Sequence, residues 1–216
     1  MPVALTASYV GLYNQNPGGL GLVQPVSPEG KGKYSGNPIL ILGGSSSVGQ
    51  NGKLRYHLSK KDFICSANFS VIQLAKLSGF SPIITTASLK HSEYLKSIGA
   101  THVIDRSITA SDLASEISGI TQNVPIKYAV DSISLPDTQQ TAYDVLPQGG
   151  KLVIFIPSAV KTTKEKDVVH VFGVLRDPAN IQLLEAFYHD NLERLLREGA
   201  IKVGRSDKYC VYLLTK

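Results

Sequence analysis

Short apolar runs alternate with stretches of helical spacing along most of this chain. The run Ile39–Leu42 is apolar at every position, which is typical of a strand buried on both faces of a sheet. Five later runs have similar length and composition, and they are bounded by Gly, Pro or Asp. The pattern predicts six strands, at residues 38–42, 82–87, 102–105, 128–133, 151–156 and 168–174.

Apolar residues recur at helical spacing between these runs, and a further such stretch precedes the first run. Gly79 and Gly99 are expected to end two of the helices, and Ser111 is expected to cap another. Nine glycines and prolines break residues 16–37 into a loop. The expected helices are residues 2–15, 69–79, 91–98, 111–117, 137–146 and 178–198. Strands that alternate with helices predict an α/β fold, with a doubly wound, mostly parallel six-stranded sheet.

A glycine-serine turn follows the first strand directly. Gly44-x-Ser46-x-x-Gly49 has the spacing of a dinucleotide-binding fingerprint, with serine at the middle position. Gly44 would permit the tight turn, and Gly49 would let the next helix pack close to the strand. The amides of Ser46, Ser47 and Val48 would face a pyrophosphate at the helix N-terminus. The fingerprint favours a Rossmann-type domain, and the alternative is an ordinary turn after a strand.

The end of the second strand bears on which dinucleotide is bound. An acid there would bind the ribose hydroxyls of NAD, but residues 85–91 contain none. Ser88, Lys90 and His91 supply the hydroxyl and cations that suit a 2′-phosphate, so we expect NADP(H) rather than NAD(H). The alternative is that Ser88 caps a helix and Lys90 is solvated. A Rossmann-like methyltransferase would also need an acid at this position.

Residues 51–68 interrupt the helix that should follow the turn. They are polar and basic with little amphipathic order, whereas joining Gln50 to Phe69 gives a continuous strand-turn-helix unit. We therefore interpret them as an insertion that forms an irregular loop or distorts the helix. Residues 51–68 and 203–216 together carry the entire net charge of +5. The basic character is thus confined to these segments, and we do not expect nucleic-acid binding.

Composition sets the remaining bounds. Hydrophobic residues make up 43% of the 216 positions and charged residues 18%, as in globular proteins. No apolar run reaches the roughly 18 residues that span a membrane, and the N-terminus lacks the features of a secretory signal. Cys65 and Cys210 make no disulfide framework and no metal motif, so we expect no zinc and a cytoplasmic protein.

The first turn and helix, the stretch PIITTASLKHSEYLKSIGATHVIDR, and the segments YAVDSIS and QGGKLVIFIP together resemble the medium-chain dehydrogenase/reductase superfamily. The zinc-independent enoyl-reductase and quinone-oxidoreductase-like branch is the most similar. The resemblance implies a linking helix and loop at residues 1–37 and a nucleotide-binding domain at 38–202. It also implies an NADPH-dependent oxidoreductase with a small-molecule substrate, and it allows a homodimer.

Three features depart from that family. The GroES-like catalytic domain that normally precedes the nucleotide-binding domain is absent. The segment 51–68 has no counterpart, and the tail 203–216 does not resemble the closing strands. Retained introns or a faulty gene model would account for all three, which the coding DNA would test. We therefore expect an incomplete form of the enzyme, or a non-catalytic nucleotide-binding fragment.

The resemblance also implies positions along the cofactor. Ile133 would border the adenine end, and Ile156 and Pro157 would lie near the nicotinamide ribose. Residues 172–174 would run beside the nicotinamide, although core packing explains them equally well. Asp105 and Asp131 end strands at the binding edge and are candidates for either a structural or a binding role. No catalytic acid or base can be named.

The insertion bears directly on affinity. A pyrophosphate site needs backbone amides held at the start of a helix. Only Val48, Gly49 and Gln50 follow the serines before the polar segment begins, and Asn51-Gly52 favours a turn. We expect this chain to bind NADPH weakly or not at all, and removal of residues 51–68 to strengthen binding.

Overall fold

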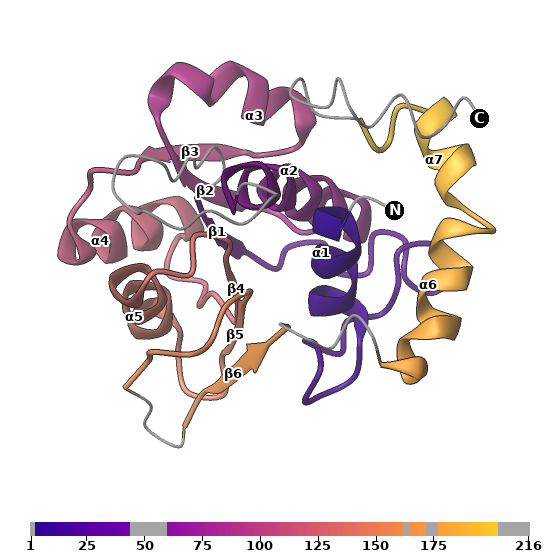
Figure 1. Cartoon of the computed structure of the whole chain (residues 1–216). Coiled ribbons are helices and arrows are strands. Elements are labelled where there is room, and N and C mark those ends of the chain that lie inside the picture. The colour runs from indigo at the N-terminus through magenta and orange to yellow at the C-terminus, as the bar shows by residue number, and fades with distance from the viewer. Residues whose placement is uncertain (1–2, 44–59, 162–164, 172–176, 203–216) are drawn as a thin grey trace.

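The computed structural model describes residues 3–43, 60–161, 165–171 and 177–202. Figure 1 shows a central sheet with helices on both faces. The elements are α1 (Val3–Tyr13), β1 (Ile39–Leu42), α2 (Lys60–Ser78), β2 (Ile83–Ala87), the 3-10 turn η1 (Leu89–His91), α3 (Ser92–Ile98), β3 (His102–Asp105), α4 (Ala110–Thr121), β4 (Tyr128–Asp131), α5 (Pro136–Val145), β5 (Lys151–Ile154), β6 (Asp167–His170), the 3-10 turn η3 (Pro178–Asn180), α6 (Ile181–Tyr188) and α7 (Leu192–Arg197).

The sheet has six strands in the order β3-β2-β1-β4-β5-β6, and every neighbouring pair is parallel. The doubly wound Rossmann-type sheet expected from the sequence is therefore confirmed. The chain order reverses between β1 and β4, which makes this the topological switch point. In such sheets ligands bind outside the carboxyl ends of the strands, so this edge positions the site.

β1 separates two hydrophobic cores. Ile39 and Ile41 belong to the larger core, whereas Leu40 and Leu42 belong to the other, and all four are at most 3% exposed. The larger core is formed with α1, α2, α3, α6 and α7, and the second with α4 and α5 (Figure 1). Alternate side chains of a strand point to opposite faces of the sheet. Because both faces of β1 are buried, all four of its residues are apolar.

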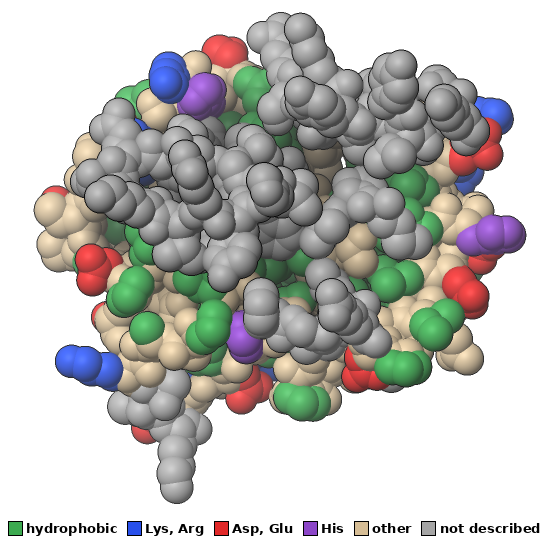
Figure 2. Space-filling view, in the orientation of Figure 1, with side chains coloured by type: hydrophobic (Ala, Val, Ile, Leu, Met, Phe, Trp, Pro, Cys, Tyr) green, Lys and Arg blue, Asp and Glu red, His purple; other side chains and the backbone are tan. Residues whose placement is uncertain are grey.

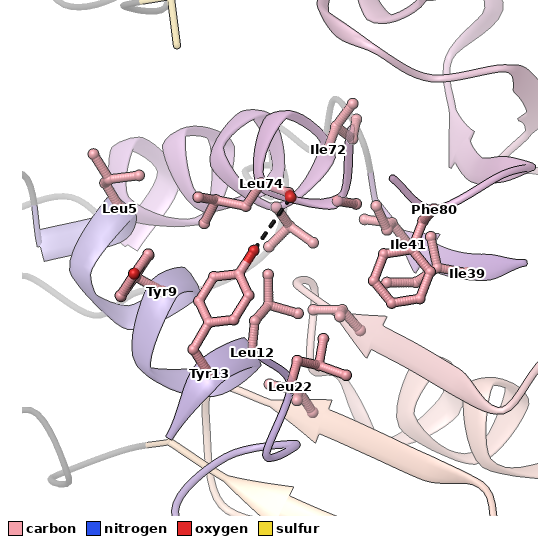
Figure 3. Packing of buried hydrophobic residues seen from close by; sticks show 14 of the residues in the cluster. Leu5, Tyr9, Leu12, Tyr13, Leu22, Ile39, Ile41, Ile72, Leu74 and Phe80 are labelled. Atoms are coloured by element: carbon pink, nitrogen blue, oxygen red, sulfur yellow. Dashed lines mark hydrogen bonds between the residues drawn. The ribbon is translucent and has the colours of Figure 1, made fainter. Parts of the chain in front are cut away.

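α1 packs beside α2 on one face of the sheet. Figure 3 shows Tyr13 directed at α2, where its hydroxyl donates to the Leu74 carbonyl at 3.2 Å. That hydroxyl also lies 2.7 Å from Ser78 Oγ. Tyr9 stacks on Phe187 of α6, with the ring centroids 4.0 Å apart. These contacts make α1 part of the core of the described structure.

An irregular loop or a distorted helix was expected over residues 51–68, and this expectation was wrong for residues 60–68. α2 begins at Lys60 and runs unbroken to Ser78, so residues 60–68 are helical. They contain neither Gly nor Pro, and extending an existing helix costs far less than nucleating a new one. Residues 51–59 lie outside the described part of the chain.

Several other boundaries differ from expectation, among them the ends of β4 and β5, which lie two residues earlier than expected. The helix expected over 178–198 is divided at residues 189–191, where Asn191 Nδ2 donates to the Ala186 carbonyl at 2.7 Å and so binds the end of α6. α4 is capped by Thr109 rather than Ser111, because Thr109 Oγ1 accepts from Asp112 N at 3.2 Å. β6 ends at His170, before the expected residue 174.

Candidate nucleotide-binding site

The carboxyl ends of the central strands lie level with one another. Leu42 is paired with Thr86 on one side and with Asp131 on the other. Gly43 follows with a φ of +88°, a backbone conformation that residues other than glycine rarely adopt. Its N–H is shared by the carbonyl and Oγ1 of Thr86, each at 3.1 Å. The chain therefore leaves β1 through a fixed glycine turn at the switch point.

The fingerprint residues that follow lie outside the described part of the chain. These are Gly44, Ser46, Ser47, Val48 and Gly49, and the same is true of residues 172–174. Their assignment to the pyrophosphate and nicotinamide stays a prediction.

The sequence-predicted residues after β2 do come together. Ser88 precedes η1, and its side chain makes no capping hydrogen bond. Lys90 is exposed and His91 half-buried within the same short turn. Partial burial, followed by the positive charges of Lys90 and Arg106, lowers the pKa of His91 below its usual value. The charges of Lys90 and Arg106 therefore lie close enough to His91 to disfavour its protonated form.

Arg106 is a member of this cluster that sequence analysis missed. It follows β3 directly, and its N–H donates to the Ala87 carbonyl at 3.0 Å, which holds it beside the end of β2. The signal was present in the sequence as the last residue of HVIDR, because the ends of adjacent parallel strands meet at one edge. Ser88, Lys90, His91 and Arg106, hereafter the cationic cluster, present a hydroxyl and cations to solvent.

The two candidate aspartates are both engaged in their own loops. Asp131 is fully buried, and its Oδ1 accepts from Ile133 N and Ser134 N, each at 2.9 Å. Burial outweighs these hydrogen bonds and raises the Asp131 pKa to about 6. Asp105 accepts from Ser107 N at 2.8 Å and Ser107 Oγ at 2.6 Å, which lower its pKa. Both aspartates therefore stabilise the loops in which they lie.

Ile133, Ile156 and Pro157 lie in two loops that follow β4 and β5 at the same edge. Ile133 and Ile156 are half-buried and Pro157 is exposed. The Gln139 carboxamide bridges these loops, with Nε2 donating to the Ser134 carbonyl at 2.9 Å and to the Pro157 carbonyl at 3.2 Å. Nothing in the sequence distinguished Gln139, because its role depends on loops that only the fold brings together.

Within the described residues there is no cluster of three or more His, Cys, Asp or Glu side chains that could hold a metal ion. The same residues include no helix long and apolar enough to cross a membrane. Figure 2 shows acidic and basic side chains scattered among each other over the described part of the visible face.

Comparison with known proteins identifies relatives that are named as reductases and dehydrogenases. Residues 69–173 match the family described as zinc-binding dehydrogenase. The trans-enoyl reductase himH of Aspergillus japonicus is 31% identical over 202 residues, covering 92% of this chain and 50% of the relative. The trans-enoyl reductase fsa3 of a Fusarium species is 32% identical over 133 residues, covering 61% of this chain and 31% of the relative. The chain thus spans half or less of the length of these relatives.

Two solved structures share the fold. JamJ enoyl reductase superposes with a TM-score of 0.61 at 20% identity, over 93% of this chain and 51% of that chain. Escherichia coli quinone oxidoreductase, solved with NADPH, gives 0.60 at 18% identity over 94% and 53%. The sheet order, the glycine turn at the switch point and these matches together show that the chain belongs to the medium-chain dehydrogenase/reductase superfamily and carries its nucleotide-binding domain.

Proposed function

We propose that this chain is the nucleotide-binding part of an NADPH-dependent oxidoreductase that reduces a small organic substrate. The names of its relatives, the trans-enoyl reductases, indicate this type of reaction. The observation that carries the cofactor assignment is the cationic cluster at the ends of β2 and β3. In a sheet of this topology the ribose next to the adenine lies beside the end of the second strand. A 2′-phosphate there would be bound by Arg106 and Lys90.

The residues fit such a phosphate in three respects. No carboxylate follows β2 before Glu93, so the position that would hold the NAD hydroxyls has no acid. The nearby Asp105 carboxylate is bound to Ser107. The lowered pKa of His91 favours its neutral form, and a ring N–H of that form can donate a hydrogen bond to a phosphate oxygen. NADPH supplies a hydride when bound, and the protein holds and orients it.

The direct test is a calorimetric titration with NADPH and with NADH at matched salt. We expect weak binding with NADPH preferred. Arg106→Ala should weaken NADPH binding by about tenfold, as expected for a lost charge-assisted contact, and leave NADH unchanged. Lys96→Ala removes an exposed charge from α3 and serves as the control. Equal losses for both nucleotides, or a preference for NADH, would overturn the assignment.

A non-catalytic nucleotide-binding fragment is the second candidate. It is favoured by one observation, that the chain spans half or less of the length of its relatives. Substrate-dependent oxidation of NADPH separates the two functions. Turnover of α,β-unsaturated thioesters or quinones by the chain alone establishes an enzyme, whereas saturable NADPH binding without turnover establishes the fragment.

A further inference from the structure

Gln139 joins two loops that the chain separates by about twenty residues. It lies in the first turn of α5 and is fully buried. Both of its amide hydrogens are used, one on the Ser134 carbonyl and one on the Pro157 carbonyl. Its Oε1 accepts from Ala159 N at 2.8 Å. The carboxamide therefore contacts the loop after β4 once and the loop after β5 twice.

The orientation of this carboxamide is fixed by its surroundings. Two carbonyl oxygens face Nε2 and one N–H faces Oε1, so a flipped amide would lose all three hydrogen bonds. Ser134 provides a second link, because its Oγ accepts from Phe155 N at 3.0 Å and donates to the Asp131 carbonyl at 2.6 Å. Ser134 has a φ of +56°, and this network holds it there.

We propose that Gln139 is a positioning residue that ties the loop bearing Pro157 to the loop after β4, and so fixes the Pro157 backbone on the nicotinamide side of the nucleotide site. This inference rests on the proposed function, and on the position beside the nicotinamide ribose that the family resemblance implies for Pro157. Gln139 itself touches no ligand. It acts by keeping the Pro157 backbone in place when the nucleotide arrives, so less ordering is required on binding.

The proposal distinguishes two halves of the cofactor. The cationic cluster, which would bind the phosphorylated adenine ribose, belongs to the ends of β2 and β3 and shares no hydrogen bond with Gln139. The loop bearing Ile133, which the resemblance places at the adenine end, keeps its own hydrogen bonds to Asp131 and Phe155. Loss of Gln139 should therefore weaken contacts to the nicotinamide half alone. A general loss of folding would instead weaken both halves together.

The test uses the full chain with Gln139→Met, which keeps the side-chain length and removes all three hydrogen bonds. In the unliganded protein, amide hydrogen exchange should accelerate at Ala159 and remain unchanged in β4 and β5. NADPH affinity should fall by about tenfold, whereas affinity for 2′,5′-ADP, which lacks the nicotinamide half, should stay within twofold. Gln182→Met makes the same change on an exposed position of α6 and should alter neither ligand.

Gln139→Glu is the second variant, and the melting temperature is recorded for all. The carboxylate keeps the acceptor for Ala159 N but removes both donors, so it should reproduce the selective loss. Unchanged NADPH affinity in both variants, or an equal loss of NADPH and 2′,5′-ADP, overturns the role of Gln139. If neither the unaltered chain nor the form lacking residues 51–68 binds either ligand, the proposed function itself is overturned and this inference falls with it.

Discussion

Asp131 shows how a buried carboxylate can organise a loop at a cost in stability. Its two oxygens accept three hydrogen bonds, from the N–H groups of Ile133 and Ser134 and from Thr138 Oγ1 at 2.8 Å. These contacts favour the ionised form, yet the loss of hydration on burial outweighs them and raises the Asp131 pKa to about 6. The ionised carboxylate therefore orders the loop while reducing the free energy of unfolding.

The sign of this effect predicts a pH dependence. A carboxyl with a folded pKa near 6 and an unfolded value of 3.8 stabilises the fold fully below pH 3.8, and this contribution is lost as pH rises through 6. Asp131→Asn keeps an oxygen for the two N–H groups and can donate to Thr138. Its free energy of unfolding, measured in urea relative to the unaltered chain, should rise by roughly 3 kcal/mol between pH 3.8 and 7.

Asp105 provides the opposite case for comparison. Its pKa is lowered by Ser107, so its ionised form stabilises the fold, and this contribution is lost as pH falls. Asp105→Asn should therefore lose stability relative to the unaltered chain as pH rises, the reverse of Asp131→Asn. A pH-independent difference for Asp131→Asn would contradict the raised pKa.

At the scale of elements, the end of α2 is set by a contact with the long loop over residues 16–37. Gly79 has a φ of +87°, and its N–H and that of Phe80 donate to carbonyls of the last helical turn. A Cβ on Gly79 would lie 2.5 Å from the Gly32 Cα. The glycine is thus required both for its backbone conformation and for the close approach of the two segments.

Gly79→Ala and Gly119→Ala form a matched pair of predictions. Gly79→Ala should lower the free energy of unfolding by about 2 kcal/mol or more, because the strained φ and the backbone overlap both oppose it. Gly119 lies within α4, where an added Cβ would meet nothing within 4 Å. Gly119→Ala should raise stability by about 0.5–1 kcal/mol. Equal effects in urea unfolding would refute the role assigned to Gly79.

At the scale of the whole molecule, α2 is longer at its N-terminus than the nucleotide site requires. Residues 60–68 add about 13 Å of helix before Phe69. If Gln50 were joined directly to Phe69, residues 47–50 would add only about 6 Å of helix. α2 returns along the sheet from the edge where the strands end, so the extension lies at the site. A pyrophosphate needs the helix start next to the end of β1, and we expect the longer helix to displace that start.

Deleting residues 51–68 should therefore raise NADPH affinity by about tenfold or more. The deletion restores the short connection from Gln50 to Phe69 and brings the helix N-terminus back to the strand end. Calorimetry on both forms at matched salt provides the measurement. The double change Lys60→Ala and Lys61→Ala in the full chain separates geometry from charge and should not raise affinity. Equal affinities of the deletion and the full chain would show that the segment does not obstruct the site.

The fold was predictable from the sequence because its signals are local. Four consecutive apolar residues in β1 define a strand buried on both faces, and glycines such as Gly79 and Gly99 mark the helix ends. Residues 85–91 likewise showed the missing acid, together with the hydroxyl of Ser88 and the cation of Lys90 on which the expectation of NADP(H) rests. These features depend on hydrophobic burial and backbone conformation over a few residues, so the order of residues along the chain is sufficient to show them.

The remaining features were decided by the tertiary structure. Arg106 joins Lys90 and His91 only because β2 and β3 are neighbours, and Gln139 contacts Pro157 only because β4 and β5 are. Residues 60–68 became helical because they extend a helix that packing against α1 and the sheet already stabilises. Each of these outcomes depends on contacts between segments distant in sequence, whose energies no local pattern of residues contains.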